Sequence, residues 1–254
     1  MITAVALRGV PEVVPGDDLG AMLADAAPGD LAAGDVVVVS QKVVSKAEGR
    51  IVRLADVAPS ARAVELAETL GKDPRAVEVV LGETEDVVRA VRGVLIVRTH
   101  HGFVCANAGV DASNAAEDDT VILLPLDPDR SARTLRARLR DVNGAAPAVV
   151  ITDSFGRAWR HGQVDIAIGC AGLSPLDDWR GRPDSSGREL RATWRSAAPG
   201  SCRSTTGPAA WTTRAGSCAR PRSRWPTRPP PRRTWPARRT RASRRWWFAG
   251  WTVM

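Results

Sequence analysis

The chain has 254 residues, of which 44% are hydrophobic and 25% are charged, and its formal net charge is +8. This length permits one or two domains, and the composition is typical of a globular protein without an apolar run long enough to cross a bilayer. The segment Met1–Arg8 lacks the basic and apolar regions of a secretory signal, so we expect a cytoplasmic protein without membrane spans.

The first part of the chain is expected to alternate strands and helices. The apolar, β-branched run Val36–Val39 predicts a buried strand. Apolar residues at helical spacing predict a helix over Ala61–Leu70, which Gly71 closes, and a second helix over Pro74–Leu81.

The same pattern continues toward the middle of the chain. Apolar runs predict strands at Val94–Val97, Val121–Leu124 and Ala148–Ile151, and an Arg-rich amphipathic segment predicts a helix over Ser131–Leu139. The connections vary too much in length to fix a topology. We therefore expect a mixed fold between α/β and α+β, in which one domain over residues 1–193 contains mixed sheets and flanking helices.

The segment 194–254 differs sharply from the rest. It contains 14 Arg, seven of the nine Trp, and no Lys, Asp or Glu, and it has no apolar period for a helix or strand. We expect this tail to be irregular and disordered. Arg, Trp and Pro together are also what GC-rich DNA encodes when it is read out of frame.

A shifted reading frame can be tested against the tail itself. Rebuilding each codon from the last base of one triplet and the first two of the next makes Trp246–Thr252 compatible with Val-Val-Val-Arg-Gly-Leu-Asp. The same shift makes Trp225–Arg239 compatible with an alanine-rich helix that ends in Gly-Lys-Ala. The decoding is degenerate, so it establishes compatibility and favours out-of-frame translation of the tail.

The four cysteines, Cys105, Cys170, Cys202 and Cys218, form no C-x-x-C pair, and the chain has only three histidines. This arrangement favours reduced thiols over a zinc site or a disulfide framework. A single catalytic cysteine stays open as an alternative, without local support.

Three polar clusters follow predicted strands, which is where ligands usually bind in such folds. Lys42 and Lys46 are spaced to place two ammonium groups beside a polyphosphate, although a solvated helix face has the same pattern. Asp111 begins the segment Asp111–Asn114, which offers a carboxylate and an amide on one turn. Its alternative interpretation is an Asx-turn or a helix cap.

Asp153 and Ser154 come directly after a predicted buried strand and are followed by Arg157 and Arg160. This order suits a hydrated divalent cation beside phosphates, with an N-cap or a surface ion pair as the alternative. Neither G-x-x-x-x-G-K-[ST] nor G-x-G-x-x-G occurs, which disfavours the standard NTPase and dinucleotide folds. The residues alone therefore predict a metal-assisted anion site.

Longer strings around these clusters carry a family resemblance. Ser40–Arg50, His101–Asn114 and Ile151–Gln163 resemble, in the same order, motifs of the coenzyme F420-0:L-glutamate ligase family. The similarity covers Val10 to about Thr193 and includes Gly16–Leu19 and Asp165–Gly169.

The resemblance implies a GTP-dependent ligase that adds L-glutamate to coenzyme F420-0 in coenzyme F420 biosynthesis. In this chemistry GTP phosphorylates the substrate carboxylate, and the amine of glutamate displaces phosphate from the acyl-phosphate to build a γ-linked polyglutamate tail. The resemblance also implies a divalent metal, Mg²⁺ or Mn²⁺, with K⁺ as a further candidate, and a homodimer. It identifies no catalytic residue in this chain.

Matching the family motifs residue by residue gives two sets of site residues. The implied GTP-contacting residues are Val10, Pro11, Glu12, Val13, Gln41, Lys42, Lys46 and Asn114. The implied metal-binding residues are Asp111, Asp153 and Ser154.

The tail departs from the family pattern, because the family's alanine-rich C-terminal helix and Gly-Lys segment occur here only in the shifted frame. One alternative is therefore a frame-shifted, catalytically inactive relative. A less favoured alternative is a nucleic-acid-binding protein in which Arg side chains of the tail contact phosphates and Trp side chains stack on bases.

Overall fold

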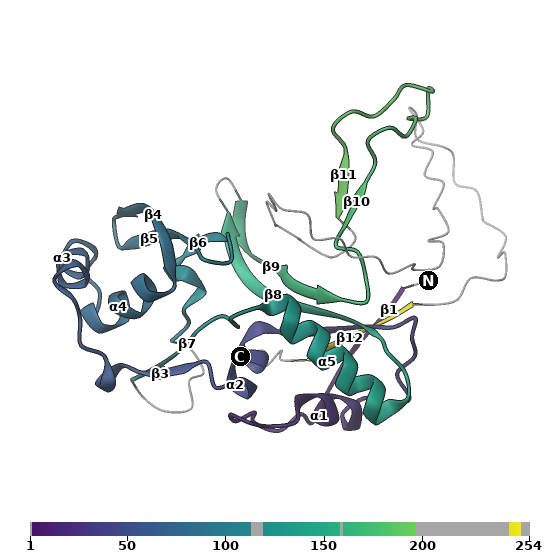
Figure 1. Ribbon diagram of the computed structural model, residues 1–254, viewed down its shortest axis with the longest axis horizontal. Coiled ribbons are helices and arrows are strands. Elements are labelled where there is room, and N and C mark those ends of the chain that lie inside the picture. The colour runs from purple at the N-terminus through teal and green to yellow at the C-terminus, as the bar shows by residue number, and fades with distance from the viewer. Residues whose placement is uncertain (1, 113–118, 158–159, 197–243, 250–254) are drawn as a thin grey trace.

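The computed structural model describes residues 2–112, 119–157, 160–196 and 244–249. It has mixed α and β content, as the sequence predicts, in a larger body built on a five-stranded sheet and a smaller lobe beside it (Figure 1). None of the described helices combines the length and the apolar composition that a membrane span requires.

The central sheet has the strand order β1-β12-β2-β8-β9. Its strands are β1 (Ile2–Ala6), β12 (Arg244–Ala249), β2 (Val36–Ser40), β8 (Ala148–Arg157) and β9 (Arg160–Ala171). The first four are parallel to one another, and β9 is an edge strand that pairs antiparallel with β8. The valine run of β2 is buried along its length, as expected for an inner strand of a parallel sheet.

Helices α2 (Gln41–Ala47) and α5 (Pro128–Asn143) pack against strands of this sheet, and helix α1 (Leu19–Asp25) packs against α5. Figure 1 shows α5 lying across β8 and β9. Helix α5 begins at the N-cap Asp127, whose side chain accepts a hydrogen bond from the backbone of Arg130, and ends at Gly144 in the left-handed conformation. Its residues Leu135 and Leu139 pack in one apolar core with Val149 and Ile151 of β8.

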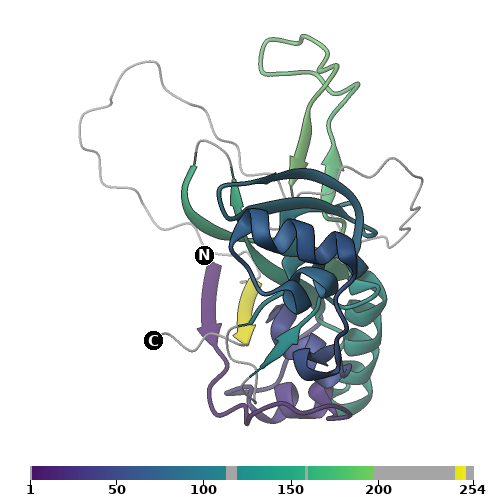
Figure 2. The same cartoon turned by 90° about the vertical axis from the view of Figure 1, so that its left-hand side faces the viewer.

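The smaller lobe consists of a three-stranded antiparallel sheet and two helices (Figures 1 and 2). Its elements are α3 (Ala61–Leu70), α4 (Pro74–Gly82), β4 (Thr84–Val91), β5 (Val94–Thr99) and β6 (Val104–Ala106). Leu66, Leu70, Val77, Leu95 and Val97 form its own buried core.

Short elements connect these parts and extend from them. Strands β3 (Ile51–Arg53) and β7 (Thr120–Ile122) pair with each other, and the 3-10 turns η1 (Leu54–Asp56) and η2 (Asn107–Gly109) follow β3 and β6. Strands β10 (Leu176–Asp178) and β11 (Trp194–Ser196) form a hairpin that projects from the body in both views (Figures 1 and 2).

Every predicted element has a counterpart, but several boundaries differ. The predicted strand Val94–Val97 continues to Thr99, and the predicted helix Ser131–Leu139 is the middle of α5, which extends it at both ends. The predicted strand Val121–Leu124 ends at Ile122, because Leu123 and Leu124 continue as buried non-strand backbone. The predicted strand Ala148–Ile151 continues to Arg157, because β9 pairs with it along almost its whole length. Asp153 and Ser154 therefore lie within β8, not after it.

Residues 1–193 contain both cores, whereas the predicted irregular tail is described only in part. Within it, Trp194–Ser196 and Arg244–Ala249 are strands, and 197–243 and 250–254 lie outside the described residues. Strand β12 occupies an inner position of the central sheet, between β1 and β2.

Candidate active site

A cavity of about 960 Å³ lies between the end of the central sheet and the smaller lobe. From the body it is lined by Gln41 and Lys42 of α2 and by Asp153 and Ser154 of β8. From the lobe and its connection it is lined by Ile96, Val104, Cys105, Asn107 and Asp111. Lys42, Asp111 and Asp153 form the charged wall of the cavity, and Ile96, Val104 and Cys105 form an apolar wall.

Helix α2 starts directly after β2, and this places its first residues at the cavity. Gln41 is almost fully buried, and its Oε1 accepts a hydrogen bond of 2.9 Å from Ser45 Oγ one turn later. Lys42 Nζ lies 2.8 Å from Asp111 Oδ2. The buried Gln41 anchors the turn from which the ammonium group of Lys42 reaches into the cavity.

Asp111 is fixed by an isolated antiparallel bridge to Ile122. Its backbone N–H donates to the carbonyl of Ile122 at 3.0 Å, and its carbonyl accepts from the N–H of Ile122 at 2.8 Å. These two bonds leave the side chain as the part of Asp111 that meets the cavity. The bridge holds the carboxylate more rigidly than a free turn would.

Asp153 reaches the cavity because β2 ends before β8 does. The last parallel pair is Ser40 with Thr152, and β8 continues beyond it. Asp153 and Ser154 are neighbours on a strand, so their side chains leave on opposite faces of the sheet, although both residues line the cavity.

Burial raises the pKa of the Asp153 carboxyl to about 6. The backbone N–H of Ser154 opposes this change, the negative charges of Asp111 and Asp165 add to it, and the charge of Lys42 partly offsets it. The site thus concentrates negative charge around a carboxylate that water reaches poorly. A nearby cation would stabilise the ionised form of this carboxylate.

Ser154 meets Asp165 directly across the two strands of the hairpin β8–β9. Ser154 Oγ donates to Asp165 Oδ1 at 2.5 Å, and the hydroxyl of Thr152 lies 3.5 Å from Asp165 Oδ2. Thr152 and Ser154 share one face of β8 because they are two residues apart. Asp165 is therefore held by hydroxyl groups on the neighbouring strand.

Lys46 lies one turn after Lys42 on α2 and is buried. Its ammonium group forms an ion pair with Glu12, which lies in the segment before α1. The segment that contains Glu12 is thereby tied to the same helix that supplies Gln41 and Lys42.

The lobe side of the cavity has an unusual backbone turn. Asn107, Ala108 and Gly109 all have positive φ angles, of 51°, 55° and 72°. Left-handed backbone is costly for Ala108, which is buried, and Lys72 Nζ donates to Asn107 Oδ1 at 2.8 Å. Beside this turn, burial and the charge of Asp153 raise the pKa of the Cys105 thiol to about 12.

The oxygen donors at this cavity fit a Mg²⁺-like cation shared with phosphates. Among the described residues there is no group of three or more His, Cys, Asp or Glu side chains arranged to hold a metal. Mg²⁺ usually needs only one or two carboxylates beside substrate phosphates and water, and it does not require a complete protein cage. Asp111 and Asp153 provide two such carboxylates, whereas the hydroxyl of Ser154 lies on the opposite face of β8, where it donates to Asp165.

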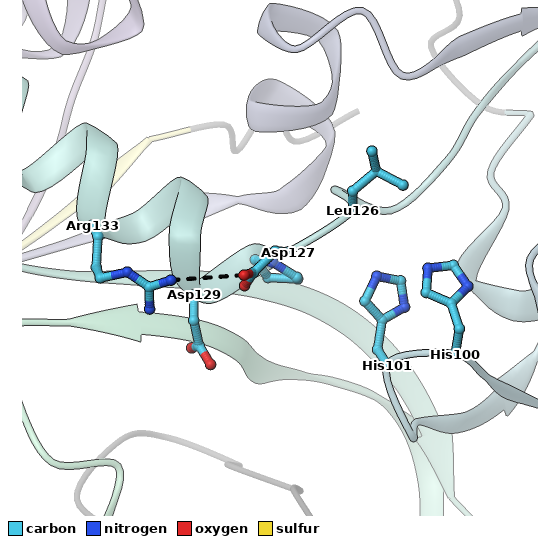
Figure 3. A pocket seen from close by; sticks show the side chains of 7 residues that line it. His100, His101, Leu126, Asp127, Asp129 and Arg133 are labelled. Carbon is cyan, nitrogen blue, oxygen red and sulfur yellow. Dashed lines mark ion pairs between the residues drawn. The ribbon is translucent and has the colours of Figure 1, made fainter. Parts of the chain in front are cut away.

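A second, more open pocket of about 430 Å³ contains none of the predicted site residues (Figure 3). His100 and His101 lie on one side of it, and Asp127, Asp129 and Arg133 lie on the other. Burial lowers the pKa of His101, whose Nε2 lies 2.8 Å from the carbonyl of Pro125. Arg133 lies 3.7 Å from Asp127, so opposite charges already meet at this pocket.

The structure brings five of the eleven predicted site residues together at one cavity. Gln41, Lys42, Asp111, Asp153 and Ser154 line the large cavity. Glu12 and Lys46 pair with each other one helical turn away, whereas Val10 and Val13 pack in or against the main apolar core. Pro11 lies in the same exposed segment, and Asn114 lies outside the described residues.

Sequence reasoning did not single out three residues at this site. Asp165 was quoted only as part of the family-like string Asp165–Gly169. It alternates with the apolar residues Val164 and Ile166, and the pairing of β9 with β8 then places it opposite Ser154. Ile96 and Val104 line the apolar wall. Their strand pattern alone cannot tell a cavity wall from a core.

The part of the chain that is similar to known proteins contains most of the helices and strands described above. The family model described as F420-0:Gamma-glutamyl ligase matches residues 9–199. Proteins named Coenzyme F420:L-glutamate ligase are similar to most of the chain. The one from Methanopyrus kandleri is 50% identical over 182 residues, which are 72% of this chain and 71% of that protein.

Two further relatives with the same name show similar coverage. The protein from Methanothermobacter thermautotrophicus is 42% identical over 195 residues, which are 76% of this chain and 77% of the relative. The protein from Archaeoglobus fulgidus is 44% identical over 187 residues, which are 74% of each chain.

Proposed function

This chain belongs to the F420-0:gamma-glutamyl ligase family, and from that membership we propose that it joins L-glutamate to coenzyme F420-0 in coenzyme F420 biosynthesis. We further propose that GTP drives the reaction through an acyl-phosphate. The observation that carries the proposal is the cavity at which three separated sequence motifs supply Lys42, Asp111, Asp153 and Ser154.

The charged wall of the cavity would bind the triphosphate of GTP. Lys42 would move its ammonium group from Asp111 toward a phosphate oxygen, a charge-assisted contact that strengthens where water is scarce. Lys46 and Glu12 would hold the preceding segment in place beside the nucleotide, and Gln41 would fix the start of α2.

Asp111 and Asp153 would hold a divalent cation, Mg²⁺ or Mn²⁺, at this cavity, and the family motifs add Ser154 as a third proposed metal-binding residue. When bound, this cation supplies positive charge that neutralises the phosphates and the charge that develops during transfer. Asp111 is held by the bridge to Ile122 and Asp153 belongs to strand β8, so two separate elements would each supply one carboxylate to the cation. K⁺ remains a further proposed partner.

The proposed reaction has two steps. A carboxylate oxygen of the acceptor attacks the γ-phosphorus of GTP, and GDP leaves. The amine of L-glutamate then attacks the acyl carbon, phosphate leaves with the electron pair of the broken C–O bond, and the amine loses a proton. The apolar wall at Ile96 and Val104 would exclude water, which would otherwise hydrolyse the acyl-phosphate.

Incubation of the purified chain with coenzyme F420-0, L-glutamate, GTP and Mg²⁺ tests this proposal. We expect mass spectrometry to detect a product heavier by one or more glutamyl residues, with one GDP and one phosphate formed for each residue added. The Asp153→Asn variant should form none, whereas Asp178→Asn, on the projecting hairpin, should match the original chain. Product formation without GTP would refute the GTP dependence.

A second candidate is a frame-shifted and inactive relative, and the end of the family match at residue 199 favours it. The relatives continue beyond their aligned part, and the tail of this chain has a composition unlike that of residues 1–193. Resequencing the codons for Gly169 to Met254 tests this candidate. A corrected frame that encodes the alanine-rich helix would exclude this candidate and favour the active ligase, and confirmation of the written codons would support it.

We also propose that the active protein is a cytoplasmic homodimer. Light scattering of the purified chain would test the dimer, which predicts twice the mass of one chain.

A further inference from the structure

We infer that Asn107 binds the acceptor substrate, coenzyme F420-0, through the N–H groups of its side-chain amide, and that Lys72 positions this amide. The inference rests on the proposed function, because it assigns one wall of the same cavity to one of the proposed substrates. Asn107 lines the cavity directly after strand β6, on the side of the smaller lobe.

The face of the lobe sheet that meets the cavity is apolar. Ile96 pairs directly with Ala106, and Val104 lies two residues before Ala106 on β6, so these three side chains share one face of the sheet. All three residues line the cavity, and Val104 is 59% exposed. A flat ring that packs on such a face removes apolar surface of both partners from water, which stabilises the complex.

The acceptor matches this wall better than the other proposed ligands do. The charged wall at Lys42, Asp111 and Asp153 suits the triphosphate and its cation. The deazaflavin ring of coenzyme F420-0 is flat and carries carbonyl oxygens at its edge, so it needs an apolar surface with a hydrogen-bond donor beside it. The guanine ring of GTP is the competing occupant, and binding of GTP to the same variants distinguishes the two.

Lys72 determines which end of the Asn107 amide can meet a ligand. Lys72 Nζ donates to Asn107 Oδ1 at 2.8 Å. An ammonium group can only donate, so the amide oxygen must face it and the NH₂ group is directed elsewhere. Within the described part of the chain, the lining of the cavity includes Asn107 and omits Lys72. The lysine therefore fixes the amide from outside the cavity, and a carbonyl oxygen of the ring can accept from the NH₂ group.

The backbone around Asn107 is held in an unfavourable conformation. The positive φ angles continue through Ala108, which is almost fully buried in the core of the lobe, to Gly109. Asparagine tolerates left-handed backbone better than alanine does. A Cβ atom at Gly109 would lie 2.9 Å from side-chain atoms of Leu124, so the turn is also tightly packed. Backbone strain of this kind persists where the surroundings enforce it, and it is concentrated at ligand sites.

Binding of coenzyme F420-0 to the full-length chain, followed by the fluorescence anisotropy of its deazaflavin ring, tests the inference. Asn107→Asp keeps the shape of the side chain, its tolerance of left-handed backbone and an oxygen for Lys72, but it replaces the donor with an acceptor. We expect the Kd for coenzyme F420-0 to rise about tenfold. A purely structural role of Asn107 predicts an unchanged Kd in this variant, and that result would overturn the inference.

The positioning role of Lys72 is tested through Asn107. Lys72→Met would let the amide turn its oxygen toward the cavity, so the Kd should rise about twofold or more, whereas Lys72→Arg keeps a donor and should bind nearly as well as the original chain. Asn107→Gly removes the amide and suits the left-handed turn. Lys72→Met added to Asn107→Gly should cause no further loss, and additive losses would refute the positioning role.

Binding of GTP in the presence of Mg²⁺ separates these outcomes from failure of the proposed function. If the original chain binds neither GTP nor coenzyme F420-0, the proposed function itself is wrong. Asn107→Asp and Asn107→Gly should bind GTP normally, as should Arg62→Met, a control on the exposed face of α3. Weaker binding of GTP alone would assign the wall to guanine. Equal losses for both ligands would mean that the turn shapes the whole cavity, and either result would overturn the inference.

Discussion

Lys42 Nζ and Asp111 Oδ2 lie 2.8 Å apart at the large cavity. This ion pair connects helix α2 to Asp111, which forms the backbone bridge to Ile122 of β7. Both side chains are partly exposed, so the pair itself adds little stability. The pair matters for the proposed function because it places an ammonium group beside a carboxylate, where the charges of the phosphates and the metal must be balanced.

The first prediction concerns Lys42. Lys42→Met removes a charge-assisted contact to phosphate, and we expect the Kd for GTP to rise at least tenfold, which corresponds to about 1.4 kcal/mol. Isothermal titration calorimetry in the presence of Mg²⁺ would measure it. Arg62→Met, on the exposed face of α3, is the matched control and should bind GTP normally. An equal effect of both substitutions would contradict a specific contact.

The second prediction concerns pH. Because the pKa of Asp153 is about 6 in the folded chain and near 4 when unfolded, the folded state holds this proton more tightly between those values. Its contribution to stability is full below about pH 4 and is lost as the pH rises through about 6. Asp153→Asn should therefore raise the unfolding free energy at pH 7 by roughly 1–3 kcal/mol and have a smaller effect at pH 5.

Urea unfolding in EDTA at several pH values would measure this difference. EDTA is needed because a bound cation would stabilise the original chain and mask the gain. A stability difference that is the same at pH 5 and pH 7 would contradict the raised pKa of Asp153.

The third prediction concerns Cys105. Its thiol is buried and its pKa is about 12, so almost no thiolate exists at pH 8. We expect the peptide that contains Cys105 to react with iodoacetamide at least 100-fold more slowly in the folded chain than in denaturant. Mass spectrometry of each cysteine peptide gives the rates. Rapid labelling of Cys105 in the folded chain would show that the thiol is accessible after all.

The fourth prediction concerns the contact between β9 and the start of α5. A Cβ atom at Gly169 would lie 2.4 Å from backbone atoms of Pro128, so Gly169→Ala must displace the helix or the strand. We expect a loss of about 1–3 kcal/mol in unfolding free energy. Gly82→Ala is the control, because no atom lies within 4 Å of its added Cβ. Similar stabilities of the two variants would mean that the close approach is absent.

The fifth prediction concerns β12. Proline at Trp247 would remove a backbone donor from a strand that pairs with β1 and β2, and prolines are not tolerated in such inner positions. Trp247→Pro should therefore lower the melting temperature markedly. Trp251→Pro, beyond β12, serves as the comparison. If the two variants melt at the same temperature as the original chain, the inner position of β12 is wrong.

Local pattern in the sequence was sufficient for the long elements. The helical spacing of Ala61–Leu70 and the valine run at Val36–Val39 each specify one kind of structure, and both were predicted within about one residue. Lys42, Asp111 and Asp153 were each expected to take part in a ligand site because each follows an apolar segment of the sequence. Their meeting at one cavity depends on topology, which the connection lengths could not determine.

The other parts depend on pairing between distant segments. The length of β8 is set by β9, and Asp111 is held by Ile122, which no periodicity in either segment reveals. Strand β12 was not expected as a strand in the written frame, because the tail that contains it is rich in Arg and Pro and shows no apolar period. Its place in the sheet is specified by backbone pairing with two partners.

The position of β12 also has a consequence for folding kinetics. Strands β1 and β2 are synthesised early, yet they are joined in the sheet by a strand that comes last among those described. The chain must close a very long loop before these pairs can form, and such non-local pairing slows folding. During synthesis the edges of β1 and β2 that pair with β12 would stay open until that strand is made, and such unpaired edges make a nascent chain prone to aggregation.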